Sequence, residues 1–264
     1  MCLEIAFVYI LKYRIGMPLD QYWKGEIIVG SVVSNSASEF IVILLPFLFF
    51  LAYKENRGYL YYILAALSII AIYFTISRAS LIMGIPTFII GTIFLCFKGC
   101  NKTLFRILSF AYLAIIVGIL IFVYASGYAE GLFEFFKTVG FNSRGRFKLW
   151  SELFEKFKKA PIFGVGFSTY MQTNPAIDQI FKGLAHNTAI QILCSTGIVG
   201  TLLFLYHIFE VAKLFVVKPT LNRVLLAFVV LLFLGISLVD QTFFFPNFTV
   251  IYTLLLVFAE KETA

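Results

Sequence analysis

Residues 59–76 read YLYYILAALSIIAIYFTI, an apolar stretch of 18 residues without a charged side chain. As a helix rising about 1.5 Å per residue, this stretch approaches the roughly 30 Å thickness of the hydrocarbon core of a bilayer. Backbone groups in lipid have no water to bind, so a segment that crosses alone must be a helix. The stretch therefore predicts a transmembrane helix.

Six similar runs extend this prediction to most of the chain. The whole sequence has a mean hydropathy of +0.93 and only 13% charged residues, so we predict an all-α fold, a polytopic integral membrane helical bundle. Residues 1–126 would hold membrane helices, residues 127–186 one long external loop with an amphipathic helix and the catalytic motifs, and residues 187–264 the C-terminal membrane helices. The apolar segment Met1–Leu11 is too short to span, and we expect the chain to be truncated before it. The six runs are Ile27–Tyr53, Leu81–Phe97, Leu104–Ser126, Thr188–Glu210, Val224–Val239 and the shorter Asn247–Ala259.

Charge and cysteine content exclude several classes of function. The formal net charge of +7 fits basic cytoplasmic loops and an anionic head-group site better than nucleic acid. The four cysteines form no CxxC pair, and the sequence has no DxD motif or His/Cys cluster. We therefore expect no nucleic-acid partner, no bound metal and no cofactor.

Short basic loops predict the orientation of the helices. Lys and Arg concentrate in the segments 54–57, 98–106 and 213–223 and at Lys261, which alternating spans place on one side, the cytoplasm. Arg78 then falls in a tight hairpin on the opposite side, where the charge rule does not expect it. An arginine there either binds a substrate anion or reaches lipid phosphate or a partner within the protein.

The external loop contains the sequence RFKLWSELFEKFKKA over residues 146–160. Its helical periodicity predicts an amphipathic helix that lies on the membrane interface or covers the bundle. Arg144 and Arg146 stand at its N-terminal end, where guanidinium groups and helix-end N–H groups suit a pyrophosphate. Beyond Pro161, Gly164 and Gly166 allow a turn or a close backbone approach. The predicted apolar stripe is Phe147, Trp150, Leu153, Phe154 and Phe157.

His186 precedes the next predicted span, with Asn187 as a candidate helix cap. A single histidine is either an interface residue or a catalytic one. Its position at a helix N-terminus, on the side of Arg78, Arg146 and Asp240, favours a neutral imidazole that accepts a proton. We predict a catalytic pair of His186 with a carboxylate, Asp240 or Glu39, whereas His207 is expected to be structural.

These residues, in this order, resemble the superfamily of O-antigen ligases and O-antigen polymerases. The resemblance extends from about Ile27 to the C-terminus. Its pieces are Ser34-Asn35-Ser36, Ser77-Arg78-Ala79-Ser80, Arg146-x-x-x-Trp150, Pro161-x-x-Gly164-x-Gly166, Ala185-His186-Asn187, Gln191 and Gly197-Ile198-Val199-Gly200.

The resemblance implies a multi-pass glycosyltransferase of the bacterial plasma (inner) membrane, with its active site facing outward. Its donor would be an undecaprenyl-pyrophosphate-linked oligosaccharide and its acceptor a hydroxyl of a second glycan, for a polymerase, or of lipid A-core, for a ligase. By the same resemblance Arg78 and Arg146 hold the pyrophosphate and His186 lies beside the reacting groups, whereas Arg144 has no counterpart in the pattern. Asn35, Glu39, Trp150, Gly164, Gly166 and Asn187 are expected to support the site.

Two other classes of function stay open. A membrane transporter or channel for a small anion would line a polar path with Arg78, Glu39 and Asp240. The repeated halves common in transporters are not evident in the sequence. The second alternative is a structural membrane subunit without catalysis.

Overall fold

The computed structural model describes residues 28–29, 32–75, 77–99, 101–125, 146–166, 170–174, 179–183, 185–216 and 220–262. It confirms a helical membrane protein, and it divides the chain into two compact units, Met1–Ser126 and Gly127–Ala264. Within the described residues, the helices long and apolar enough to cross a bilayer are Asn35–Lys54, Arg78–Lys98 and Thr188–Val216. Arg144 and Met1–Leu11 lie outside the described residues.

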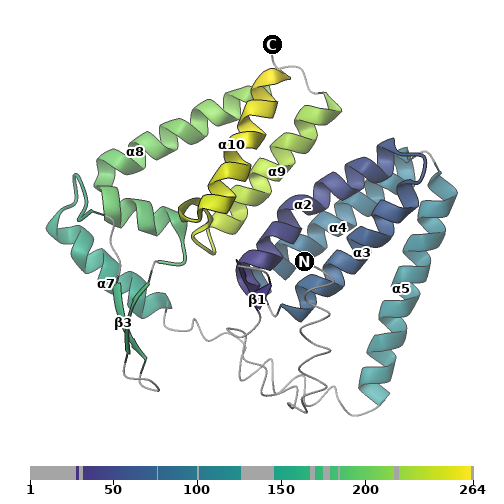
Figure 1. Ribbon diagram of the computed structural model, residues 1–264, viewed down its shortest axis with the longest axis horizontal. Coiled ribbons are helices and arrows are strands. Elements are labelled where there is room, and N and C mark those ends of the chain that lie inside the picture. The colour runs from purple at the N-terminus through teal and green to yellow at the C-terminus, as the bar shows by residue number, and fades with distance from the viewer. Residues whose placement is uncertain are drawn as a thin grey trace. The chain divides into compact units, whose positions relative to one another are not determined.

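The first unit contains the four helices predicted for this part of the chain (Figure 1). The first of them begins at Ser34 rather than Ile27, because Ile28–Val29 and Val32–Val33 pair as the short antiparallel strands β1 and β2. The β-branched Ile and Val residues of this segment favour extended backbone. The helices are α2 (Ser34–Lys54), α3 (Gly58–Phe74), α4 (Arg78–Lys98) and α5 (Lys102–Ala125).

Aromatic and aliphatic side chains form the core of the first unit. The ring of Phe49 packs edge-on against those of Tyr62 and Phe88 and lies directly over Gly91, where a Cβ atom would come within 2.4 Å of it. A glycine is therefore required for this close packing of α4 on α2. The buried cluster consists of Leu45, Phe49, Ala52, Tyr62, Ala65, Phe88, Leu95 and Phe105.

The second unit contains the predicted amphipathic helix and the three C-terminal helices. A β-hairpin follows the amphipathic helix inside the long loop, with Tyr170 paired to Gly183 and Asn174 to Gln179. The elements are α7 (Arg146–Lys159), β3 (Tyr170–Asn174), β4 (Gln179–Gly183), α8 (Thr188–Val216), α9 (Leu221–Ser237), the 3-10 helix η3 (Thr242–Phe244) and α10 (Pro246–Lys261).

Helix α7 buries a face that overlaps the predicted stripe without matching it. Leu149 and Leu153 are buried against Ala185 and Cys194, whereas Phe147 is 68% exposed. Trp150 and Phe157 pack at the edge of this cluster. Three members of the predicted stripe, Leu153, Trp150 and Phe157, therefore belong to this cluster. Leu149 joins them, whereas Phe147 and Phe154 are exposed, so the buried face is rotated by part of a turn from the predicted stripe.

Helix α8 bends at Gly197, whose backbone has φ 67° and ψ −163°. The bend frees the carbonyls of Cys194 and Ser195, which accept hydrogen bonds from the backbone N–H groups of Val165 and Gly166 at 3.2 and 3.0 Å. The segment 198–216 beyond the bend is about 28 Å long at helical rise and can cross a bilayer core on its own. In two further hydrogen bonds α8 is the donor: Ile198 N donates to Pro161 O at 2.9 Å, and Val199 N donates to Ile162 O at 3.1 Å.

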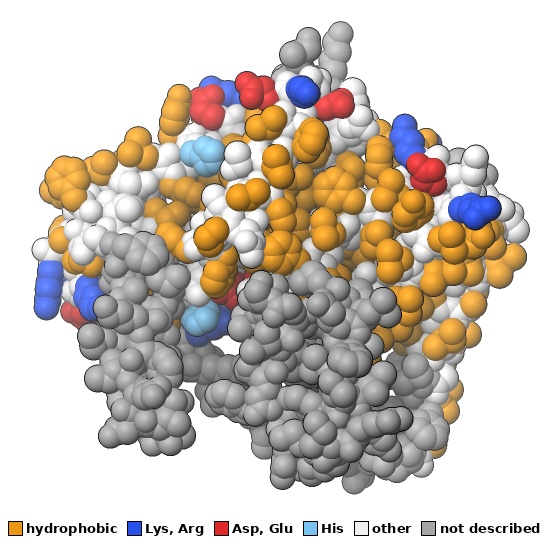
Figure 2. Space-filling view, in the orientation of Figure 1, with side chains coloured by type: hydrophobic (Ala, Val, Ile, Leu, Met, Phe, Trp, Pro, Cys, Tyr) orange, Lys and Arg blue, Asp and Glu red, His pale blue; other side chains and the backbone are white. Residues whose placement is uncertain are grey.

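Hydrophobic side chains cover most of the described helical surface. On the face drawn in Figure 2 they occupy the middle of the helices, and many of the charged side chains lie near helix ends. In water such a surface would aggregate, whereas in a bilayer it faces lipid.

Candidate active site

His186 occupies a turn just before α8 and adopts a left-handed backbone conformation with φ 49°. It is the only non-glycine with positive φ among the residues that the structure describes. Such a conformation is costly for a residue with a Cβ atom and persists where the surroundings impose it. Two buried glutamine side chains do so here, because Gln191 Oε1 accepts from Ala185 N at 2.8 Å and Gln241 Oε1 accepts from His186 N at 3.0 Å.

Asp240 lies after the end of α9 and faces the imidazole ring of His186. Its Oδ1 atom is 3.3 Å from His186 Nδ1, and the side chains of His186 and Asp240 are 38% and 8% exposed. An ionised carboxylate only accepts hydrogen bonds, so the contact suits the tautomer of a neutral imidazole that carries its proton on Nδ1 and leaves Nε2 as an acceptor. The structure thus brings together the histidine and one of the two carboxylates considered from the sequence.

Further hydrogen bonds join the two segments that carry this pair. Asn187 Nδ2 donates to Leu238 O at 2.6 Å, and Thr188 Oγ1 donates to Asp240 O at 3.3 Å. Asn187 Oδ1 also accepts from Ile190 N at 3.0 Å, which confirms the predicted helix cap. The turn before α8 and the loop after α9 therefore form one structural element.

Helix α7 attaches to the same element through two side chains. Arg146 Nη1 donates to Val239 O at 2.9 Å, which places the guanidinium beside the residue that precedes Asp240. Trp150 Nε1 donates to Ala185 O at 2.8 Å, beside the residue that precedes His186. One helix therefore contacts the residues that precede both members of the pair.

The two glycines of the Pro161-x-x-Gly164-x-Gly166 motif differ in their surroundings. A Cβ atom on Gly164 would lie 2.4 Å from the backbone of Ser195, so this position requires a close backbone approach. A Cβ atom on Gly166 would meet nothing within 4 Å, but this residue has φ 81°, which glycine adopts readily. The sequence left open a turn or a close backbone approach, and Gly164 makes the close approach. Residues 161–166, the docking segment, pack their backbone against the bend of α8.

The remaining predicted residues belong to the first unit. The starts of α2 and α4 lie together there, because Ser38 Oγ and Ser80 Oγ are hydrogen-bonded at 2.8 Å. Glu39 is 1% exposed, and Arg78 is exposed as the first residue of α4. Asn35 Oδ1 is buried without a hydrogen-bond partner in the part of the chain that the structure describes.

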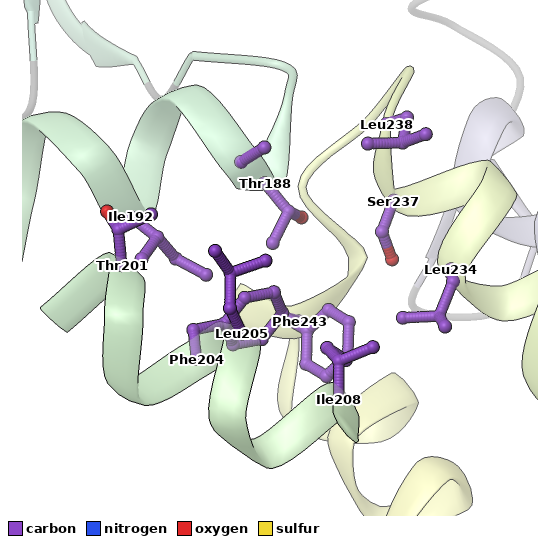
Figure 3. Close-up of a pocket in the computed structure, with 11 residues that line it drawn as sticks. Thr188, Ile192, Thr201, Phe204, Leu205, Ile208, Leu234, Ser237, Leu238 and Phe243 are labelled. Atoms are coloured by element: carbon purple, nitrogen blue, oxygen red, sulfur yellow. The ribbon is translucent and has the colours of Figure 1, made fainter. Parts of the chain in front are cut away.

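An apolar pocket of about 220 Å³ lies inside the bend of α8 (Figure 3). Thr188 belongs both to this pocket and to the hydrogen bonds around Asp240, so the pocket adjoins the His186–Asp240 pair. Sequence reasoning missed it because the pocket depends on the bend and on residues from three elements. The lining residues are Thr188, Ala189, Ile192, Thr201, Phe204, Leu205, Ile208, Leu234, Ser237, Leu238 and Phe243.

Two other features bear on the site. His207 Nε2 lies 3.1 Å from Tyr252 Oη, and its ring packs beside that of Phe204, so His207 has a structural environment. Within the described ranges, no group of three or more His, Cys, Asp or Glu side chains lies close enough to hold a metal ion.

Comparison with known families identifies the class of protein. The O-antigen ligase family matches residues 63–205, more than half of the chain, and the protein belongs to this family. It is therefore a bacterial inner-membrane enzyme of the glycan-transferring type, acting with a lipid-linked oligosaccharide donor and a glycan acceptor. No curated protein and no solved structure gives a match. The matched range contains Arg78, Arg146 and His186, whereas Asp240 lies beyond it.

Proposed function

We propose that the protein transfers a glycan from an undecaprenyl-pyrophosphate carrier to an acceptor hydroxyl at the outer face of the plasma membrane. The observation that carries this proposal is the contact between His186 Nδ1 and Asp240 Oδ1, with Arg146 bound to the adjacent Val239 carbonyl. The oriented imidazole supplies a proton acceptor, and the guanidinium bound next to Asp240 supplies an anion-binding group, the two functions that such a transfer needs.

In the proposed reaction, His186 Nε2 removes the proton of the acceptor hydroxyl as its oxygen attacks the anomeric carbon of the donor sugar. A new glycosidic bond forms while the bond from that carbon to the pyrophosphate oxygen breaks. The bonding electrons leave with the undecaprenyl pyrophosphate, whose added charge is stabilised by arginine. Asp240 stabilises the imidazolium that results. Because pyrophosphate is a good leaving group, the residues can perform this step without a metal.

Arg146 and Arg78 are the proposed pyrophosphate ligands, with Arg144 as a further candidate. If each helix from α2 to α10 except the external α7 crosses the membrane once, the starts of α2 and α4 face the same compartment as the start of α8. Asn35, Glu39 and Arg78 then share that compartment with His186 and Asp240. A planar guanidinium suits this task because it presents paired donors to phosphate oxygens.

The apolar pocket beside the pair supports a lipid-linked donor. Its wall is formed by side chains such as Ile192, Phe204 and Leu234 and is too apolar for a sugar. The external region between α5 and α8 is of moderate length, which favours a polymerase that joins lipid-linked repeat units. Transfer to lipid A-core by a ligase is the second candidate within the same chemistry.

The test replaces the pair in the full chain and measures transfer in membranes supplied with undecaprenyl-pyrophosphate-linked glycan. We expect His186→Ala to lower the rate by about 10²–10⁴-fold, the usual contribution of a general base, and to accumulate the lipid-linked donor. Asp240→Asn should also lower the rate of transfer. His207→Gln, which retains a hydrogen-bond partner for Tyr252, is the matched control and should transfer normally.

Each outcome of this test bears on the proposal. A ladder of polymer from the wild type supports polymerase activity, whereas product only on a lipid A-core acceptor shows a ligase. Wild-type transfer by His186→Ala at equal protein level would remove the histidine from the mechanism, whereas no transfer by the wild-type protein would favour the anion-transporter alternative.

A further inference from the structure

Gln241 contacts both members of the His186–Asp240 pair. Its side-chain Oε1 accepts from His186 N at 3.0 Å, and its own backbone N–H donates to Asp240 Oδ1 at 2.8 Å. The residue is 8% exposed. Gln241 follows Asp240 directly, yet its side chain reaches back across to the turn before α8, 55 residues away in the sequence.

The side-chain bond acts on a backbone conformation that a histidine does not adopt readily. At φ 49°, the peptide N–H of His186 points toward the loop after α9, where the Gln241 carbonyl receives it. If this bond is removed, the partly buried N–H loses its acceptor and the residue gains by returning to negative φ. That rotation would carry the imidazole away from Asp240 Oδ1.

We propose that Gln241 is a positioning residue for transfer, holding His186 in the left-handed conformation in which Nδ1 meets Asp240. The proposal rests on the proposed function, because it gives Gln241 importance only if His186 acts on the acceptor. It assigns no contact of Gln241 with the substrate. Its two hydrogen bonds can be separated, since a side-chain substitution removes the bond to His186 and leaves the backbone bond to Asp240.

The test compares two substitutions of similar size in the full chain, Gln241→Met and Gln241→Glu. Methionine fills the same volume without a strong acceptor, whereas a glutamate oxygen can still accept from His186 N–H. With purified protein in lipid nanodiscs and undecaprenyl-pyrophosphate-linked glycan as donor, we expect Gln241→Met to lower kcat by about 10–100-fold, as small misplacements of catalytic groups do. The KM for the donor should change less than about threefold, and Gln241→Glu should recover most of the lost kcat.

Lys158→Met, on the exposed face of α7, is the control and should behave as wild type. A purely structural role for Gln241 would reduce the yield of folded protein but leave kcat per folded molecule unchanged, and that result would overturn the proposal. Equal losses in the Met and Glu variants would also overturn it, since the acceptor would then not matter.

The same assay separates the positioning role from the proposed function. Normal kcat in Gln241→Met together with an inactive His186→Ala removes only the positioning role. Normal kcat in both variants removes the catalytic role of His186, and no transfer by the wild-type protein removes the proposed function itself.

Discussion

Gly197→Ala tests whether the bend in α8 depends on glycine. At φ 67° an alanine is strained by about 1–2 kcal/mol. Its Cβ would also lie 2.3 Å from Ile162 O and 2.5 Å from Gly164 N, and both are backbone atoms that cannot rotate away. The docking segment would have to separate from α8 and lose up to four hydrogen bonds, each contributing about 1 kcal/mol. Together these effects predict a destabilisation of about 3–6 kcal/mol.

Trp150 reports the change, because its indole is hydrogen-bonded to Ala185 and packs on the cluster that includes Cys194 of α8. With Trp23→Phe as background, Trp150 is the only tryptophan, and its fluorescence can follow thermal unfolding of the purified protein. A loss of this size should lower the transition midpoint by on the order of 10 °C. Glycan transfer should fall with it, since α7 also carries Arg146.

Two glycines provide graded controls. Gly166→Ala adds strain at φ 81° but meets no neighbour, so we expect an effect of about 1 kcal/mol. Gly118→Ala, on α5, meets no atom within 4 Å and should be silent or slightly stabilising. If Gly197→Ala and Gly118→Ala unfold at the same midpoint temperature, the bend of α8 does not depend on glycine at position 197.

Two further predictions concern charge and orientation. Arg146→Lys should keep the protein in the membrane but lose most glycan transfer, because lysine cannot present a planar pair of donors. The control Lys158→Ala, at an exposed side chain, should change transfer little. Full transfer by Arg146→Lys would show that Arg146 provides only a surface charge. In a background without native cysteines, Thr173→Cys should react with a membrane-impermeant thiol reagent in intact cells and Asn101→Cys should not, whereas labelling at Asn101 alone would reverse the orientation.

The membrane helices could be predicted from sequence because each is determined by its own composition. A run such as 59–76 has no alternative to a helix in lipid, whatever surrounds it. The exception is informative, since residues 28–29 and 32–33 of the first run pair as antiparallel strands instead of continuing the helix. Hydropathy identifies what can lie in a membrane, whereas the choice between strand and helix at its edge depends on β-branched residues and turns.

The site was less predictable because its contacts depend on tertiary structure. His186 and Asp240 are 54 residues apart, and the sequence also left Glu39 open as a partner. Gln241 had no motif at all, because its role follows from a backbone angle at His186 and from the return of its side chain across the loop. Gly164 and Gly166 were recognisable as special, but only the bend of α8 shows which backbone Gly164 approaches.

The docking of the external segment also has a consequence for how the family can diversify. The chain between Gly166 and Ala185 leaves from and returns to the same short piece of α8, since Gly166 N is bound to Ser195 O and Ala185 N to Gln191 Oε1. Both anchors precede the bend, so the β3–β4 hairpin is an appendage closed at its base. A change in the length of this hairpin would therefore leave both anchors, and the histidine that follows Ala185, in place.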